Sequence, residues 1–332
     1  MRYLVVLIVL HWASLAAAQD WEDRQLFGQP EAERTLRIIS STDISFFAPV
    51  IDSFLADRPG VAVDYMVTGT ADLDRIFRAD PDGFDMVISS AMDLQIKLTN
   101  DGFAQRVEGI PLPPWAEWRQ SLFAFTSEPA AIVINKDAFA GHPIPATRQE
   151  LIQALRARPE VFQNRVGTYD VRQSGLGYLF ATQDARATDT FWRLMEVLGN
   201  LNARLYCCSG DMIDDLADGT LAVAYNVLGS YAAARTDARD KLEIILPSDY
   251  PTTMMRTVLV SRTTQDADLA AGFVDHLVGA QSDAAERTLP PLMTAASDGG
   301  QVSIALEPAL MTYLDALKRR TFLAEWQNAV IQ

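Results

Sequence analysis

Hydroxyl side chains stand at the ends of three consecutive predicted strands in the first third of the chain. Ser41 and Thr42 follow the first strand, Thr70 follows the second, and Ser89 and Ser90 end the third. The carboxyl ends of parallel strands lie at one edge of a sheet, beside helix N-termini that present free N–H groups. Helix capping would explain each hydroxyl separately, whereas a polar ligand lying across the three loops explains them together. We therefore predict a polar ligand at this edge.

A second candidate group surrounds Arg172, which is followed closely by Ser174 and Gly175. A guanidinium group binds a carboxylate or a phosphate through paired hydrogen bonds, and a helix N-terminus adds donors and the positive end of a dipole. The alternative is that Arg172 is a surface arginine paired with a nearby aspartate. We predict an anion site here. Further contacts to the ligand are expected from Tyr169, Asn226, Tyr231 and Tyr250.

Catalytic motifs are not found in the sequence. Ser174 lacks the glycine two residues earlier that a nucleophile elbow requires, since Arg172 occupies that place. A Walker-type lysine loop, an HExxH pair and a GxGxxG helix opening are also missing. The 43 acidic and 28 basic residues give a net charge of −15, which repels nucleic-acid phosphates. We expect no catalysis, no cofactor, no metal and no nucleic-acid partner.

The only two cysteines of the sequence, Cys207 and Cys208, are adjacent. This spacing excludes a CxxC redox motif and a multi-cysteine zinc site. Two alternatives stay open. The cysteines are either two buried thiols or a vicinal disulfide formed in an oxidising compartment.

The N-terminus has the features of a signal peptide. Arg2 precedes the apolar run at residues 3–10, and Ala16 and Ala18 supply the small residues of a cleavage site. The apolar run is too short to span a membrane permanently. We predict cleavage after Ala18 and a soluble, monomeric protein in the periplasm.

Alternating strands and helices must position the candidate residues. Predicted strands at 35–40, 61–67 and 84–88 are separated by predicted helices, and this alternation indicates a parallel, helix-covered sheet. A length of 332 residues fits two domains. The expected organisation is a signal peptide at 1–18, a polar leader at 19–34, lobe 1 at 35–127 and about 252–295, lobe 2 at 128–251, and C-terminal helices at 296–332 packing on the lobes.

Residues 166–178 and 225–231 resemble family 1 extracellular solute-binding proteins of ABC importers, and in particular their iron-type and phosphoglycerate-type branch. The resemblance extends over nearly the whole mature chain. It implies an α/β protein with the type 2 periplasmic binding protein fold. In that fold two α/β lobes are joined by a two-segment hinge and close on a ligand in the cleft between them.

The resemblance also implies a membrane partner, for which two alternatives stay open. The partner is either an ABC permease in the inner membrane or a sensor histidine kinase of a two-component system. Ferric-ion binding is a further, weaker interpretation, because ferric-ion members carry two adjacent tyrosines where this chain has Tyr225, Asn226 and, later, Tyr231. We expect the solute to be a small organic anion captured by hinge closure.

Overall fold

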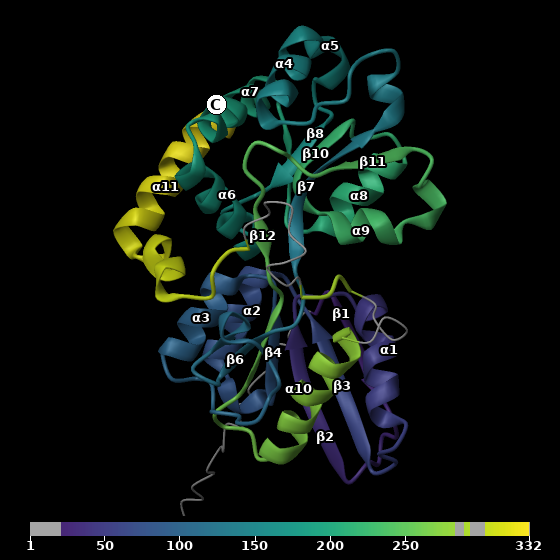
Figure 1. Cartoon of the computed structure of the whole chain (residues 1–332), viewed down its shortest axis with the longest axis vertical. Coiled ribbons are helices and arrows are strands. Elements are labelled where there is room, and N and C mark those ends of the chain that lie inside the picture. The colour runs from purple at the N-terminus through teal and green to yellow at the C-terminus, as the bar shows by residue number, and fades with distance from the viewer. Residues whose placement is uncertain (1–20, 283–288, 293–302, 332) are drawn as a thin grey trace, which may run out of the picture.

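The computed structural model describes residues 21–282, 289–292 and 303–331. These residues form two α/β lobes, one above the other in Figure 1, each built around its own sheet. The predicted signal peptide, residues 1–18, lies outside the described residues. Across the described part of the chain, no helix is both long enough and apolar enough to cross a membrane.

The sheet of lobe 1 has seven strands in the order β1-β3-β2-β4-β13-β6-β5. Strand β2 pairs in parallel with β3 and β4, whereas β1 and β13 join the sheet antiparallel. The three predicted strands therefore lie side by side with their carboxyl ends at one edge. The strand bounds are Asp23–Phe27 (β1), Arg34–Ser40 (β2), Val61–Val67 (β3), Met86–Ser89 (β4), Glu117–Trp118 (β5), Leu122–Ala124 (β6) and Thr257–Val260 (β13).

Four helices cover the two faces of this sheet. Helices α1 (Ile44–Leu55) and α10 (Ala267–Ser282) lie on one face, where Phe54 packs edge-on against Phe273 at 5.0 Å between ring centroids. Helices α2 (Thr70–Ala79) and α3 (Met92–Asn100) lie on the other face. The apolar spacing of α1 places its buried residues on the side of the helix that packs on the sheet, and α1 starts at the sheet edge because it follows directly from the end of β2.

The segment that we expected to be a polar leader contributes a strand instead. Strand β1 pairs antiparallel with β3, from Asp23 opposite Val67 to Phe27 opposite Val63. Four of its five residues are exposed, so backbone pairing rather than apolar burial holds the strand. An ion pair between Arg24 and Asp64, at 2.6 Å, adds to it. The leader prediction is wrong for this stretch, which belongs to lobe 1.

Lobe 2 contains a second sheet, in the order β11-β7-β10-β8-β9. Strand β10 is parallel to β8 and antiparallel to β7. Its strands are Glu128–Asn135 (β7), Val166–Tyr169 (β8), Arg204–Tyr206 (β9), Val223–Leu228 (β10) and Leu242–Ile245 (β11). Its helices are Arg148–Ala157 (α4), Pro159–Phe162 (α5), Gly175–Ala187 (α6), Thr190–Asn200 (α7), Ser209–Ala217 (α8) and Gly229–Ala234 (α9).

Two crossover segments run side by side between the lobes. The start of β7 pairs with the short strand β12 (Thr253–Met254), which places Met254 opposite Glu128. Beyond β12, Arg256 forms two hydrogen bonds with Glu128, at 2.9 Å and 3.1 Å, and both side chains are fully buried. The crossovers coincide with the hinge expected from the resemblance.

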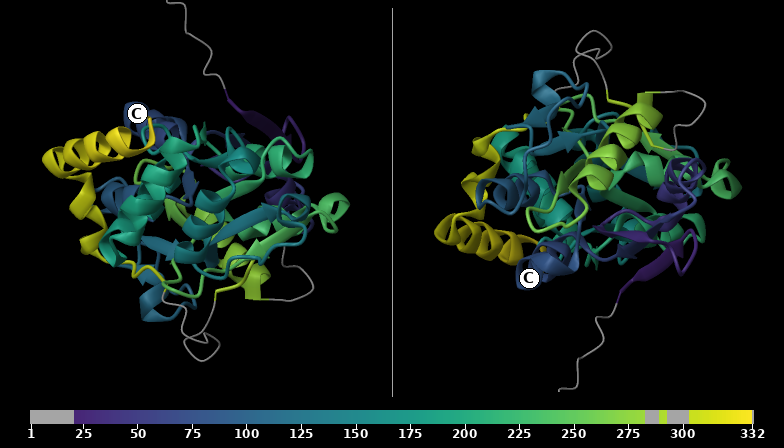
Figure 2. Two further views of the ribbon diagram at one scale, coloured as in Figure 1. Left: turned by 90° about the horizontal axis from the view of Figure 1, so that it is seen from above. Right: turned by 90° about the horizontal axis from the view of Figure 1, so that it is seen from below.

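The C-terminal segment contacts both lobes. The 3-10 helix η5 (Pro308–Leu314) packs on α3 of lobe 1, and helix α11 (Ala316–Val330) packs on α7 of lobe 2. Trp326 of α11 is 1% exposed within the core of lobe 2. Figure 2 shows this segment in yellow along one flank of the molecule. Shorter 3-10 helices lie at Pro81–Gly83, Pro114–Ala116, Lys136–Phe139 and Thr236–Ala238.

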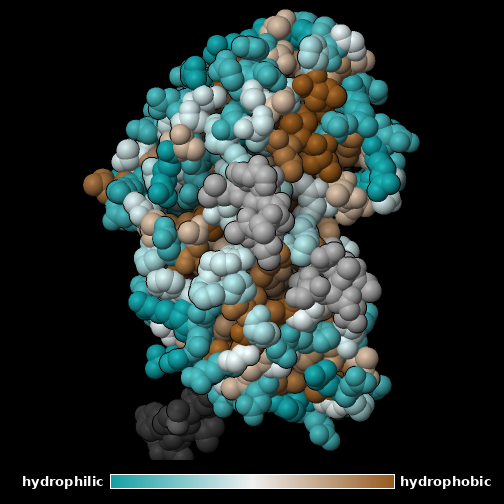
Figure 3. Space-filling model, viewed as in Figure 1, coloured by the Kyte–Doolittle hydropathy of each residue, from teal (hydrophilic) through white to brown (hydrophobic). Residues whose placement is uncertain are grey.

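The face shown in Figure 3 has a largely hydrophilic periphery, with hydrophobic areas on the upper lobe and in the middle of the lower lobe. Such a surface agrees with the excess of acidic residues in the sequence.

Candidate functional site

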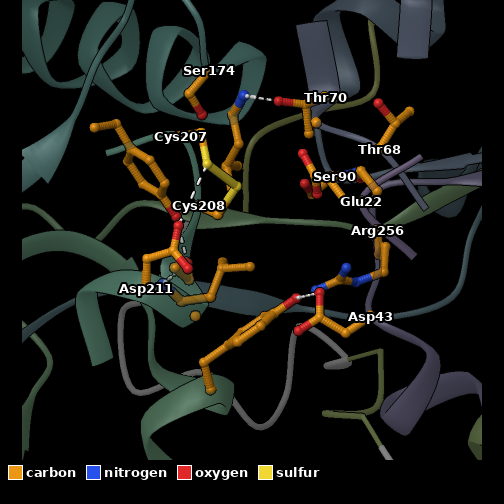
Figure 4. Close-up of a pocket in the computed structure, with 18 residues that line it drawn as sticks. Glu22, Asp43, Thr68, Thr70, Ser90, Ser174, Cys207, Cys208, Asp211 and Arg256 are labelled. Carbon is orange, nitrogen blue, oxygen red and sulfur yellow. Dashed lines mark hydrogen bonds between the residues drawn. A yellow bond between two sulfur atoms is a disulfide. The ribbon is translucent and has the colours of Figure 1, made fainter. Parts of the chain in front are cut away.

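A cavity of about 320 Å³ lies between the two lobes. Figure 4 shows residues of lobe 1 and lobe 2 facing each other across it. Lobe 1 contributes Glu22, Ser41, Asp43, Thr68, Thr70 and Ser90. Lobe 2 contributes Tyr169, Ser174, Cys207, Cys208, Asp211 and Tyr231. Ser209 of lobe 2 and Arg256, from the crossover, also line the cavity.

The parallel strands of lobe 1 bring the predicted hydroxyls together at this cavity. Ser41, Thr70 and Ser90 line it. Thr42 and Ser89 are buried behind them and bind other parts of the protein. Thr42 Oγ1 accepts a hydrogen bond from Arg256 of the crossover, and Ser89 Oγ accepts one from the backbone N–H of Ala91. The hydroxyl pattern thus combines cavity-lining groups with structural ones.

The N-terminus of α6 also reaches the cavity. Ser174 and Tyr169 line it, and Ser174 Oγ accepts a hydrogen bond from the N–H of Gly177 at 3.1 Å. Gly175 lies against lobe 1, where an added Cβ would stand 3.1 Å from Thr70 Oγ1. Gly175 therefore permits close approach of the lobes and does not itself line the cavity.

Arg172 is not part of the cavity lining. Its Nε and Nη2 atoms donate to the carboxylate of Asp170, at 2.8 Å and 2.6 Å, and its side chain is 37% exposed. The prediction that Arg172 anchors an anion is therefore not supported by its position. The local aspartate pairing, our alternative from the sequence, is the arrangement found.

Asn226 and Tyr250 belong to a separate buried network inside lobe 2. Asn226 Nδ2 and Tyr225 Oη donate to Asp184 Oδ2, at 2.8 Å and 2.6 Å. The fully buried guanidinium of Arg148 donates to Asp184 Oδ1 at 3.3 Å and lies 3.7 Å from the centroid of the Tyr250 ring. Neither Asn226 nor Tyr250 lines the cavity, so the structure assigns both to the support of lobe 2.

Tyr231 connects the lobes at one side of the cavity. Its hydroxyl donates to Asp43 Oδ1 at 3.3 Å, and its ring lies 4.9 Å from that of Phe46. At another side, the N–H of Leu176 donates to Thr70 Oγ1 at 3.1 Å. These contacts join α1 and α2 of lobe 1 to α9 and α6 of lobe 2, so the structure has its lobes in contact around the cavity.

Three acidic residues face the cavity, and we call Glu22, Asp43 and Asp211 the pocket carboxylates. Desolvation by the cavity walls is the largest cause that raises the pKa of each above its ordinary value. Repulsion adds to it: Asp43 and Asp211 raise the pKa of Glu22, and Asp211 raises that of Asp43. The lining thus concentrates negative charge in a partly desolvated space.

Arg256 offsets the negative charge of the pocket carboxylates only in part, because its guanidinium is already bound to another carboxylate. It forms a buried ion pair with Glu128, whose other acceptor positions are filled by Ser230 Oγ at 2.7 Å and Thr126 Oγ1 at 3.0 Å. Burial alone would raise the pKa of Glu128. The charge and hydrogen bonds of Arg256, together with the hydrogen bonds from Ser230 and Thr126, more than offset burial, so that the pKa of Glu128 is lowered. Glu128 is therefore ionised and engages the guanidinium.

Cys207 and Cys208 are joined by a vicinal disulfide in the cavity wall, which decides between the two alternatives left open by the sequence. The Sγ atom of Cys207 lies 3.7 Å from Asp211 Oδ2. Cys207, Cys208 and Asp211 are the one group of three metal-ligand-type side chains, among the described residues, whose ligand atoms all lie within 4.8 Å of one another. Because the two sulfurs are bonded to each other, they are not free thiolates.

The pocket carboxylates and Arg256 were not among the site residues predicted from the sequence, and the two cysteines were not expected to line the site. One signal was available for Asp43, which directly follows the hydroxyls already selected at the end of the first predicted strand. Asp211 follows no strand predicted from the sequence and gave no such signal. Glu22 and Arg256 gave no such signal, because Glu22 lies in the supposed leader and Arg256 in a return crossover.

Comparison with known proteins places this site in a family. Residues 66–311 match the family model described as bacterial extracellular solute-binding protein. The substrate-binding protein of an ABC transporter from Agrobacterium tumefaciens is 31% identical; the match covers 93% of this chain and 98% of that one, with a TM-score of 0.86. No curated protein matches the sequence.

Two more distant solved structures share the fold. AfuA from Actinobacillus pleuropneumoniae, with fructose-6-phosphate bound, is 14% identical, with coverage of 90% of this chain and 99% of that one and a TM-score of 0.72. Iron-bound HitA from Pseudomonas aeruginosa is 12% identical, with coverage of 89% and 99% and a TM-score of 0.65. The predicted α/β, type 2 periplasmic binding protein fold is confirmed. The chain belongs to the bacterial extracellular solute-binding proteins of ABC transporters.

Proposed function

We propose that this protein captures a small solute in the inter-lobe cavity and delivers it to an ABC permease in the inner membrane. The observation that carries the proposal is the cavity of about 320 Å³ whose walls come from both lobes. Small-molecule sites are concave, lie preferentially between domains and start at about 300 Å³. The cavity is at the small end of that range, so it suits a compact metabolite.

Hinge closure supplies the binding step in this proposal. The crossovers at Glu128 and Arg256 are paired and buried, while the contacts of Tyr231 with Asp43 and of Leu176 with Thr70 join the lobes only across the cavity. Separation of the lobes would break the latter contacts and leave the crossovers paired. A solute that touches both walls would favour the closed arrangement by its differential contacts.

The chemistry of the solute has to be taken from the cavity itself. The proteins that bind fructose-6-phosphate and iron are below 25% identical to this chain, and such likeness carries the fold alone. The small organic anion expected from the sequence depended on Arg172, which pairs with Asp170 outside the cavity. We therefore propose solute capture without assigning an organic anion as the solute.

A pair of glycine variants tests solute capture. A Cβ on Gly210 would point toward the cavity, 3.9 Å from the Tyr231 ring and 4.0 Å from Asp43 Oδ2, whereas one on Gly279 in α10 would meet nothing within 4 Å. Gly210→Leu should fill the cavity, and Gly279→Leu is the matched helical control. Mass spectrometry of small molecules released from protein purified from the periplasm should detect a solute with wild type and Gly279→Leu and not with Gly210→Leu.

Equal solute content in both variants would contradict binding in this cavity. Delivery is tested separately by uptake of the identified solute in cells that lack the protein. Lost uptake that wild type restores and Gly210→Leu does not is the expected result. Normal uptake in the deletion strain would contradict delivery and favour the sensor-kinase partner.

A further inference from the structure

The lining of the inter-lobe cavity carries an excess of negative charge. The pocket carboxylates come from three separate segments: the residue before β1, the start of α1 and the first turn of α8. None of them forms a salt bridge to a described residue, and Arg256 is the one arginine or lysine among the lining residues that the structure describes. The Arg256 guanidinium is bound to Glu128 and attracts only Asp43 among the pocket carboxylates, so one cation faces three carboxylates in addition to Glu128.

Backbone donors that would attract an anion are already engaged. At the start of α2 the N–H of Gly69 donates to the Glu22 carboxylate. At the start of α6 the N–H of Leu176 donates to Thr70 Oγ1. At the start of α8 the first turn carries Asp211, so the positive end of that helix faces a carboxylate of the chain itself. The N-termini of α2 and α6 thus donate to acceptors of the protein itself, and that of α8 carries a carboxylate that opposes a bound phosphate or carboxylate.

Two buried hydroxyls provide an independent indication of a ligand. Thr68 and Ser90 are 5% and 2% exposed, line the cavity, and make no side-chain hydrogen bond to a described residue. Figure 4 shows both on the lobe 1 wall, beside Glu22. Because these hydroxyls face the cavity without a protein partner, their oxygens can accept a hydrogen bond from an ammonium group there. The aromatic rings of Tyr169 and Tyr231, also in the lining, are surfaces that attract cations.

The positions of the carboxylates favour an organic cation over a bare metal ion. Among described residues, the carboxylate oxygens of Glu22, Asp43 and Asp211 do not form a group within 4.8 Å of one another. A single small ion needs its oxygen ligands at roughly 2.0–2.6 Å and so draws them together. Spread carboxylates around a cavity of about 320 Å³ suit a molecule with its own carbon skeleton.

We propose that the solute is an organic cation whose protonated or quaternary amine is held by the pocket carboxylates. This inference rests on the proposed function, since it assigns a chemical class to the same cavity. The carboxylates supply the charge for either kind of amine, and the hydroxyls of Thr68 and Ser90 accept hydrogen bonds from a protonated one. Closure of the lobes brings Asp43 and Asp211 toward the solute from opposite walls.

Titration calorimetry on ligand-free protein tests the inference with putrescine, ethanolamine and choline as probes, and with fructose-6-phosphate and ferric citrate as comparators. At least one amine should bind. Asp43→Asn and Asp211→Asn should each weaken it about 10- to 100-fold, as expected for loss of a hydrogen bond to a charged group. Asp240→Asn, an exposed aspartate outside the cavity, is the matched control and should bind like wild type.

Each other outcome overturns the inference in a recognisable way. Binding of none of the amines refutes the cation assignment, and binding of fructose-6-phosphate that Asp43→Asn strengthens shows that the cavity takes an anion. In both cases, a solute retained by Gly279→Leu and lost by Gly210→Leu would leave solute capture intact. Amine binding that Gly210→Leu does not change would place the amine outside the cavity.

Discussion

Replacing Arg256 by Met should destabilise the protein because it leaves Glu128 buried without its counter-ion. Both side chains are fully buried, and Arg256 donates to Glu128 at 2.9 Å and 3.1 Å. Removal of one partner from a buried ion pair costs about 3–5 kcal/mol. Glu128 keeps the hydrogen bonds from Ser230 and Thr126 in the variant, so we expect the lower end, about 3 kcal/mol of the free energy of unfolding.

A surface pair with similar geometry provides the control. Arg24 donates to Asp64 at 2.9 Å and 2.6 Å, but its side chain is 53% exposed. Loss of such a pair costs about 0–1 kcal/mol. Urea unfolding of ligand-free wild type, Arg256→Met and Arg24→Met should therefore give clearly different midpoints. The double variant Arg256→Met/Glu128→Met should lose less than Arg256→Met, because no charge is then left buried.

The pH dependence gives a second readout of the same pair. The pKa of Glu128 is lowered in the folded protein, so in wild type the pair stabilises fully above the unfolded pKa of about 4.3 and is lost as pH falls through the folded value. Without Arg256, burial dominates and raises the pKa of Glu128. The cost of Arg256→Met should therefore shrink on acidification. A cost below about 1 kcal/mol that does not change with pH would refute this reasoning.

Four further outcomes are expected. Arg172→Ala should leave solute affinity within about 3-fold of wild type by calorimetry, because its ion pair is partly exposed; a loss above about 30-fold would restore the anion site. Trp326→Ala should lower the free energy of unfolding in urea by about 3–5 kcal/mol, because the side chain is 1% exposed and its removal leaves a cavity. A loss below about 1 kcal/mol would show that α11 is dispensable for stability. Reduction of the Cys207–Cys208 disulfide should weaken solute binding, and equal affinity with and without reductant would make the disulfide a passive wall. Affinity for an amine should rise as pH increases from about 4 to 7, because the raised pKa values of the pocket carboxylates require proton release on binding; calorimetry showing proton uptake would contradict this.

Periodicity located most of the framework because strands buried on both faces carry a strong apolar signal. Strand β3 occupies Val61–Val67, as predicted, and β2 occupies Arg34–Ser40, where 35–40 was predicted. Strand β1 was missed because its side chains are mostly exposed and its pairing with β3 is a property of the backbone. A sequence pattern based on apolar spacing has no access to such a strand.

The site was only partly predictable for a related reason. Hydroxyls at parallel strand ends converge by topology, and Ser41, Thr70 and Ser90 do so. The choice of partner for Arg172 depended on the turn that brings Asp170 within 2.6 Å of it, and no spacing rule distinguishes that aspartate from a ligand. With 43 acidic residues in the chain, the carboxylates that face the cavity are visible only once the lobes are placed.

The distribution of each lobe along the chain constrains the order in which the protein acquires its shape during synthesis and export. The sheet of lobe 1 needs β13 between β4 and β6, and the core of lobe 2 needs Phe322 and Trp326 from α11. A chain that emerges from its N-terminal side therefore exposes the first strands of lobe 1 long before β13 arrives. Neither lobe can complete its core on a partial chain. Both cores, and the cavity whose walls they carry, are therefore properties of the finished molecule alone.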